Sequence, residues 1–537
     1  MKRMIAVWMM ILCISFLQGA AETAGSDALS GAAESLIGIW EFERTDSLDI
    51  VFTAYAEFTP DGLYIHHHVG ESEDGSYINC SIDTYEVQGS MLDGNSSFVI
   101  EGDTLTITTA GFWEEQKSTY HRVTQRPPEL YVIERTGDYC YTVEANGQAT
   151  IMRYVGDYDA AQERLVIPAD LNGYPVTGIG PNAFERCPVG IVELPDSITA
   201  IGRLAFSNAQ IHDILIPDSV TEIGASAFSE NLFESVTIPA SVRSIGDSAF
   251  DHCFDLKEVH LPEGLESMGE CVFSGCGSLE QIVLPDSLAR LDANPFDRCE
   301  ALTDIVISDS HPYLYMKDGA LFTKADRKLI SFPCKSPAEH YAIPEGTTAI
   351  ANHAFEGNRY LVSVTIPDSV SEIGEFAFAD TWSLESIRIP QGVTEIRRNT
   401  FYNAISLREV RLPDGLTDIG YQAFWQCGTL SEINIPSSVI RIDHEAFRQC
   451  YSLTDLTLPE GIQTIGSWAF EDCKGLTDIH LPASLTEIGD RAFTYYNAYS
   501  VPNHVPPKAT FTVVAGNYAE QYCIENGLNY VSRDTAN

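Results

Sequence analysis

Side chains that could bind a cation or act as acids and bases recur at fixed places in the chain. Most lie four residues before a proline, or before Ser308 where that proline is replaced. The acidic members are Asp213, Glu258, Asp304, Glu409, Glu432, Asp455 and Asp478. His260 and His480 lie two residues before the same prolines. Carboxylates and imidazoles serve both acid–base catalysis and cation binding, so these nine residues are the candidate binding site.

The spacing of these residues argues against hydrolysis. A glycoside hydrolase needs one close carboxylate pair in a cleft with separated pKa values, whereas these side chains form an evenly spaced stripe. The chain also has no HExxH, GxSxG, P-loop or GxGxxG followed by a helix. We predict a protein that is not an enzyme and has no catalytic residues and no cofactor. The stripe is either a solvated face that resists sheet stacking or a surface for a cationic or polar partner or bridging calcium.

The stripe belongs to a repeat of 22 or 23 residues. "LTDLTLPEGIQTIGSWAFEDC", at 453–473, recurs with a marker Phe that runs from Phe184 to Phe493 and is interrupted once. Such a fixed period is typical of a solenoid. One unit is too small to bury its own Leu, Ile and Phe, but parallel strands of stacked units, about 4.8 Å apart, can bury them together.

Each unit can be divided into three parts. Alternating apolar and polar residues predict a short strand with both polar columns facing outward, and Pro459 ends it. We expect a second extended piece with Ile462 and Ile465 pointing inward, and Gly466 to permit a backbone bend. A turn or single helical turn then places Phe470 in the core. The fold class is a β-rich solenoid of short parallel strands.

The unit "LxxIxLPxxLxxIGxxAFxxC" resembles the leucine-rich repeat of the BspA-like surface proteins of bacteria. The resemblance covers residues 139–532, with flanks at 140–184 and 510–531 that resemble the caps of a solenoid. It implies a secreted or surface-displayed protein of adhesin type that binds an extracellular protein or glycan.

The interruption lies at residues 309–340. "YLYMKDGALFTKADRKLISFP" predicts a β-hairpin inserted into a rung, with turns near Asp318-Gly319 and Ala325-Asp326. It is either a structural elaboration of the array or an irregular surface that carries binding, because loops on rigid scaffolds often do so.

Cysteines form a column three residues after the marker Phe. The members are Cys187, Cys253, Cys276, Cys299, Cys427, Cys450 and Cys473. Parallel stacking holds equivalent atoms near about 4.8 Å, which is poorly suited to disulfides. We predict a ladder of buried thiols facing backbone groups, because Asn231 and Asn358 occupy the same position.

Residues 36–124 lack the repeat. Short alternating runs between Asp-Gly and similar turns predict an antiparallel meander, in a small closed barrel or sandwich. Gly38-Ile39-Trp40 resembles the opening of lipocalin-like domains. An alternative function is therefore a small-molecule carrier or enzyme in this barrel, and another is a structural envelope component. His66 and His68 could share a ligand, but they lack a diagnostic partner, so we predict no metal site. Residues 125–138 are the predicted linker.

The N-terminal segment predicts export, and the net charge excludes two kinds of partner. Lys2 and Arg3, a 14-residue apolar run at 4–17 and the small residues Gly19 to Ala21 predict a cleaved signal peptide at 1–21. The run is too short for a transmembrane span, which needs about 20 residues. A formal net charge of −44 argues against nucleic acid or an anionic membrane as a partner.

Overall fold

The structure is a computed structural model. It describes residues 38–45, 51–58, 63–72, 75–84, 87–88, 91–92, 96–101, 104–109, 116–123, 132–156, 164–496, 504–505 and 508–534. The signal peptide predicted at 1–21 lies outside these residues, as does the first half of the predicted linker, 125–131. The chain forms two compact units: residues 1–157 with 170–183, and residues 158–169 with 184–537.

The first unit begins with a nine-stranded antiparallel sheet in the order β4-β3-β2-β1-β9-β8-β7-β6-β5. Its strands are β1 (Gly38–Thr45), β2 (Val51–Phe58), β3 (Leu63–Ser72), β4 (Gly75–Thr84), β5 (Val87–Gln88), β6 (Met91–Leu92), β7 (Ser96–Glu101), β8 (Thr104–Thr109) and β9 (Gln116–Val123). Consecutive strands pair, as a meander requires, and β1 pairs with both β2 and β9.

Trp40 is fully buried in this sheet, and the Arg122 guanidinium lies 4.2 Å from the centre of its ring. His66 and His68 lie on β3. The pairing order ends at β4 and β5, and closure into a barrel or a lipocalin-like domain stays a prediction. The same unit continues with β10 (Glu134–Thr136), β11 (Tyr139–Val143), β12 (Ala149–Tyr154), β14 (Asp170–Leu171) and β15 (Tyr174–Ile179).

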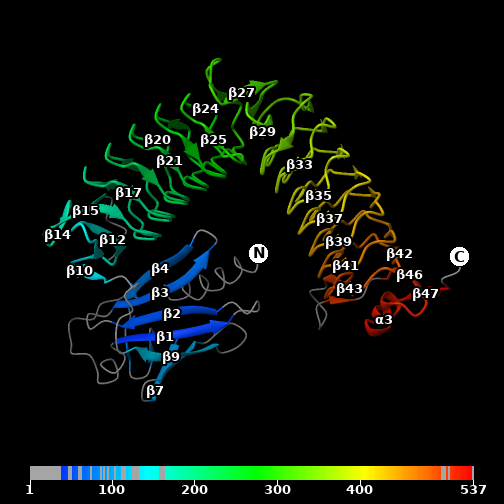
Figure 1. Cartoon of the computed structure of the whole chain (residues 1–537), viewed down its shortest axis with the longest axis horizontal. Helices are drawn as coiled ribbons and strands as arrows, with labels where there is room; N and C mark the ends of the chain where they lie inside the picture. The colour runs from blue at the N-terminus through cyan, green and yellow to red at the C-terminus, as the bar shows by residue number, and fades with distance from the viewer. Residues whose placement is uncertain are drawn as a thin grey trace. The chain divides into compact units, whose positions relative to one another are not determined.

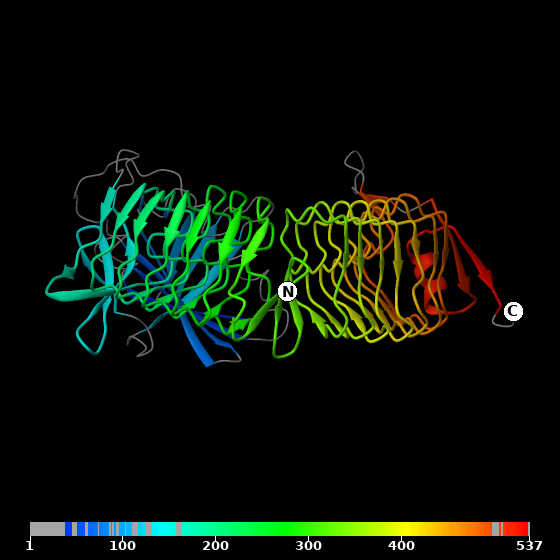
Figure 2. The same ribbon diagram turned by 90° about the horizontal axis from the view of Figure 1, so that it is seen from above.

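The second unit is the predicted solenoid of short parallel strands, and Figure 2 shows its rungs stacked side by side. We call the strand before the repeat proline the first strand of a rung. The first strands are β13 (Arg164–Val166), β16 (Ile191–Glu193), β18 (Asp213–Leu215), β20 (Ser235–Thr237), β22 (Glu258–His260), β24 (Gln281–Val283), β26 (Asp304–Val306), β30 (His340–Ala342), β32 (Ser363–Thr365), β34 (Ser386–Arg388), β36 (Glu409–Arg411), β38 (Glu432–Ile433), β40 (Asp455–Thr457) and β42 (Asp478–His480).

A second short strand follows the proline in each rung, and Figure 1 labels several of them. These second strands are β17 (Ala200–Ile201), β19 (Glu222–Ile223), β21 (Ser244–Ile245), β23 (Ser267–Met268), β25 (Arg290–Leu291), β31 (Ala349–Ile350), β33 (Glu372–Ile373), β35 (Glu395–Ile396), β37 (Asp418–Ile419), β39 (Arg441–Ile442), β41 (Thr464–Ile465) and β43 (Glu487–Ile488). The inward positions are as predicted, since Ile462 and Ile465 are at most 1% exposed.

Each rung closes with a turn that carries the marker Phe. Phe470 is 1% exposed and stacks on Phe447 and Phe493, with ring centroids 5.2 and 5.3 Å apart. Trp468 lies two residues before Phe470 and Asp472 lies two residues after it, and both have left-handed backbones, with φ of 57° and 61°. Their N–H groups donate to carbonyls of the next turn. The turns therefore form a further hydrogen-bonded ladder between rungs.

Gly466 is required for a reason other than the predicted bend. Its φ is not positive; instead, a Cβ at this position would lie 2.4 Å from the backbone nitrogen of His444 in the preceding rung. Close backbone approach, not a left-handed conformation, excludes a side chain here.

The insertion forms β27 (Leu314–Lys317), β28 (Ala320–Thr323) and β29 (Lys328–Ser331), which pair antiparallel in that order. Asp318 and Gly319, with φ of 49° and 84°, make the first turn. β29 then pairs parallel with the second strand β31, so the last strand of the insertion rejoins the solenoid ladder.

The C-terminal end contains the one helix of the described residues, α3 (Tyr518–Glu525). Asn517 caps it by accepting a hydrogen bond from the backbone N–H of Glu520. The remaining strands are β44 (Tyr495–Tyr496), β45 (His504–Val505), β46 (Thr510–Val514) and β47 (Tyr530–Arg533). β46 pairs with β42 and β47. This segment therefore covers β42, which is the final first strand along the array.

Candidate functional site

The predicted acidic stripe lies on the first strands and faces outward. In β40 the central Leu456 is 3% exposed, while Asp455 and Thr457 on either side are exposed. The same alternation places the candidate residues Asp213, Glu258, His260, Asp304, Glu432, Asp455 and Asp478 in exposed positions, with Glu409 and His480 half-buried.

The strand register divides the stripe into two kinds of surface. In the early rungs each acid lies opposite a neutral residue, as Glu258 does with Ser235 and Asp304 does with Gln281. In the late rungs acids lie opposite acids. Glu409 is in register with Glu432, and Asp455 is in register with Asp478. We call these four residues the acid pairs.

Neighbouring side chains compensate some of this charge. Glu258 Oε1 lies 3.2 Å from His260 Nε2, and Glu409 accepts a hydrogen bond of 2.5 Å from Arg411 Nε. This hydrogen bond raises the pKa of Arg411. The remaining members of the acid pairs have no ion pair among the described residues, although Asp455 and Asp478 accept hydrogen bonds from neighbouring threonines.

A shallow hollow lies at the end of the stripe. Its volume is about 470 Å³, and its lining includes Glu460, His480 and Arg533. It is a feature of the late rungs and of the C-terminal strand β47.

The cysteine column is buried and free of disulfides in the described part of the chain. Cys253 Sγ–H donates to the carbonyl of Phe228 at 3.3 Å, and Cys450 donates to that of Phe424 at 3.2 Å. Asn231 donates its side-chain N–H to the carbonyl of Phe206, so Asn and Cys occupy this position for the same reason. Burial raises the pKa of Cys253 to about 12. These thiols are structural hydrogen-bond donors.

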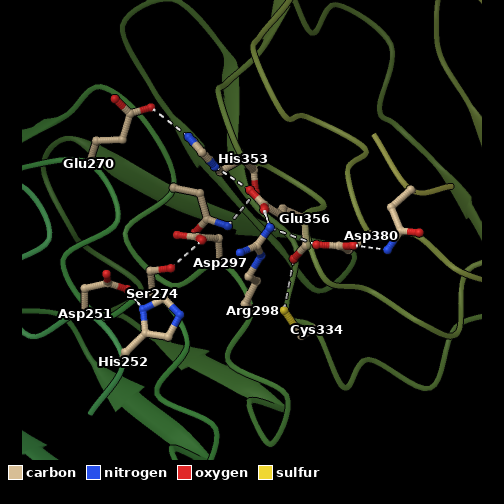
Figure 3. Close-up of polar contacts among 12 residues, drawn as sticks. Asp251, His252, Glu270, Ser274, Asp297, Arg298, Cys334, His353, Glu356 and Asp380 are labelled. Carbon is tan, nitrogen blue, oxygen red and sulfur yellow. Dashed lines mark hydrogen bonds and ion pairs between the residues drawn. The ribbon is translucent and has the colours of Figure 1, made fainter. Parts of the chain in front are cut away.

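A polar cluster that the repeat pattern did not predict lies on the turns beside the insertion. We call it the turn cluster, and Figure 3 shows most of its members. It comprises Glu270, Cys271, Asp297, Arg298, His353, Glu356 and Asp380. The insertion brings it together, because the turn at 294–298 meets the turn at 352–356. The Asn294 backbone N–H donates to the Asn352 carbonyl, and its side chain donates to the His353 carbonyl.

Each cation of the turn cluster bridges two carboxylates (Figure 3). Arg298 Nη2 lies 2.7 Å from Glu356 Oε1 and 2.9 Å from Asp380 Oδ2. His353 Nε2 lies 3.2 Å from Glu270 Oε1, and its Nδ1 contacts Glu356. Glu356 thus lies between the two cations and is 2% exposed.

These contacts shift the pKa values of the cluster. Burial alone would lower the pKa of His353, but its hydrogen bonds to Cys271 and to two carboxylates outweigh burial and raise it. The hydrogen bond from His353 lowers the pKa of Glu270. Burial raises the pKa of Asp297 and that of Glu356. His353 is therefore an imidazolium clamped between acids near neutral pH.

The sequence held no distinctive signal for this cluster. Asp297 and Glu356 occupy the position after the marker Phe, but charged residues occupy the same position in other rungs, as Glu185, Asp251 and Glu471 do. Only the contact between the two turns shows that these residues form one site.

The stacked rungs define a leucine-rich-repeat solenoid. A family model described as BspA type Leucine rich repeat region, in six copies, matches residues 177–303, 330–454 and 440–505. These matches cover more than half of the chain, which therefore belongs to this family, and the predicted resemblance is confirmed.

Solved structures are similar along most of the chain. A leucine rich cell surface protein from Faecalibacterium prausnitzii is 27% identical, with a TM-score of 0.48, over 71% of this chain and 99% of that one. The pneumococcal vaccine antigen PcpA is 22% identical, with a TM-score of 0.51, over 75% of this chain and 99% of that one; this likeness shows the fold. A comparison with curated proteins finds no match. No helix within the described residues has the length and apolarity needed to cross a bilayer.

Proposed function

We propose that this protein is a non-catalytic, secreted or surface-displayed binding protein. Its first-strand face, and above all the acid pairs, binds a cationic or polar protein or glycan outside the cell. The observation that carries the proposal is the register of Glu409 with Glu432 and of Asp455 with Asp478. The BspA-type family and the adhesin-type role implied by the sequence resemblance agree with it.

The physical argument is the cost of like charges on adjacent strands. Carboxylates directly opposite each other on neighbouring strands destabilise a sheet. They do not point into the core: Glu409 is half-buried and the other three acids are exposed. A Lys or Arg of a partner, or a bridging Ca²⁺, would relieve that repulsion on binding.

The scaffold favours binding over catalysis. The hydrogen-bonded rungs are already ordered, so a partner meets a surface that loses little conformational entropy. The acids lie on an outward sheet face, where water reaches them, whereas paired catalytic carboxylates work in a cleft.

The test reverses one member of each acid pair in the full chain, as Glu432→Lys with Asp455→Lys. A control with the same change of net charge is Glu222→Lys with Glu487→Lys, two exposed residues on second strands that lie opposite neutral residues. Binding to matrix proteins, mucins and polysaccharides is measured with calcium and with chelator. We expect saturable binding that the first variant loses and the control retains.

The same variant distinguishes lost binding from unfolding. It places an opposite charge across each acid pair, so we expect its stability to be unchanged or higher. Equal binding by both variants, or no binding by the wild type, would contradict the proposal and favour a role in the N-terminal sheet or in envelope structure.

A further inference from the structure

We propose that Cys271, Asp297 and His353 of the turn cluster form a binding site for one divalent transition-metal ion, of which zinc fits best. None of these three residues was predicted from the sequence to bind a metal. The site is separate from the acid pairs and does not depend on the proposed binding function.

The geometry supplies three ligand atoms at one point. Cys271 Sγ, a carboxylate oxygen of Asp297 and a ring nitrogen of His353 all lie within 4.8 Å of one another. Cys271 and His353 both occupy the left-handed position two residues before a marker Phe, with φ of 57° and 61°. Asp297 directly follows the marker Phe296, whose rung lies along the chain between the rung of Cys271 and the rung of His353.

Asp297 provides the second, independent observation. It is 2% exposed, and its Oδ2 accepts a 2.7 Å hydrogen bond from the Ser274 hydroxyl, but Oδ1 has no hydrogen-bond partner. A buried carboxylate oxygen without a donor costs free energy. Burial raises the pKa of Asp297, and the charge of His353, the Ser274 and Cys271 side chains and the charge of Arg298 oppose that shift, yet no hydrogen bond reaches Oδ1.

The nearby cations are already engaged. Arg298 is bonded to Glu356 and Asp380, and His353 contacts Glu270 and Glu356. No ion pair of Asp297 occurs among the described residues. A metal ion beside Oδ1 would give this buried oxygen a directly bonded partner, which no side chain of the described residues provides.

The donor set selects the metal. One thiolate, one imidazole and one carboxylate suit Zn²⁺, which takes Cys, His and Asp in tetrahedral sites, and are a poor match for the all-oxygen shells of Ca²⁺ and Mg²⁺. Cys271 is partly exposed, which leaves a route for the ion to enter.

Binding must release protons, because the ligands have to be deprotonated. The Cys271 thiol and one ring N–H of His353 each lose a proton as the metal bonds form. One divalent ion thus replaces two protons, and the net charge of the cluster is unchanged. His353 contacts Glu270 and Glu356 through its two ring nitrogens, and the metal displaces one of these carboxylates from the nitrogen that it binds. The other carboxylate keeps its hydrogen bond and orients the imidazole. The displaced carboxylate becomes available as a fourth ligand.

The test uses the full chain, freed of metal by a chelator and titrated with Co²⁺ and then Zn²⁺. We expect one ion per chain, the absorption of tetrahedral cobalt, a thiolate-to-cobalt charge-transfer band and release of about two protons per ion. Affinity should rise with pH. Zn²⁺ should displace the cobalt and raise the Tm, as a ligand of the native state does.

Variants assign the site. Cys271→Ser should abolish the charge-transfer band, whereas Cys450→Ser, a buried cysteine of the column, should retain it. Asp297→Asn keeps the shape of the side chain and should weaken binding more than tenfold; it carries the test if Cys271→Ser does not fold. Absence of stoichiometric binding by the wild type, or full binding by Cys271→Ser or Asp297→Asn, would overturn the proposal.

Discussion

Replacement of Phe470 by Ala tests which positions of a rung point into the core and which point toward the binding face. Phe470 is 1% exposed and stacks on Phe447 and Phe493 with interplanar angles of 4° and 2°. Loss of a buried Phe side chain costs about 3–5 kcal/mol. Phe470→Leu retains most of the apolar contact but loses two stacked ring pairs, and at about 0.5–1.5 kcal/mol each it should cost about 1–3 kcal/mol.

Asp455→Asn in the same rung is the matched control. Asp455 faces solvent and lies opposite Asp478, so its carboxylate contributes repulsion and no packing. We expect a change within about 0.5 kcal/mol, in the stabilising direction.

The assay is urea unfolding of the full chain combined with hydrogen exchange of the rungs from 447 to 493. Exchange is needed because each rung of a solenoid is stabilised by its neighbours and the array can open locally. We expect Phe470→Ala to accelerate exchange in its own and adjacent turns and Asp455→Asn to leave it unchanged. Equal losses of stability in the two variants would refute the assignment of inward and outward positions.

Three further outcomes are expected. Cys253 and the nine other buried cysteines of the described chain should not react with a thiol reagent at pH 8 until the protein is denatured, since burial raises the pKa of Cys253 to about 12; fast reaction of the native protein would contradict this. Gly466→Ala should cost about 1–3 kcal/mol through overpacking against the preceding backbone, whereas Gly415→Ala, with nothing within 4 Å of its Cβ, should be neutral or stabilising in the same urea assay. The hydrogen bond to Asp251 raises the pKa of His252, so the stability that His252→Gln removes should be greatest below the ordinary pKa of 6.5 and disappear as pH rises through the raised value. Because this ring is partly exposed, the difference should stay below about 1 kcal/mol, and a difference that grows with pH would contradict it.

The regular part of the fold could be predicted because one physical requirement is repeated in every rung. Alternation before Pro459 determined which side of the strand is buried, and the period of Phe470 determined that rungs stack. Sequence did not reveal the reason for Gly466. The atom that excludes a side chain there is the backbone nitrogen of His444, and a contact between backbones leaves no mark in the pattern of side chains.

The outward position of the acidic stripe was predictable for the same reason. Its division into acids opposite neutral residues and acids opposite acids was not. Spacing places Glu258 and Glu432 in equivalent positions, yet one lies opposite Ser235 and the other opposite Glu409. The difference arises from which residue the neighbouring rung supplies. It becomes visible when the repeats are compared position by position across adjacent rungs.

The turn cluster follows from the point at which the repeat fails. In a perfect repeat every position would present the same side chain to the next rung, which suits an extended surface of like groups and excludes a site of mixed ligands. The insertion separates Asp297 from His353 in sequence while the turns at 294–298 and 352–356 stay in contact. Cys271, Asp297 and His353 can then differ in type and still meet. A rigid array thus provides repeated chemistry along its strands and single-site chemistry where its turns depart from the pattern, and the second kind requires the first to hold its ligands in place.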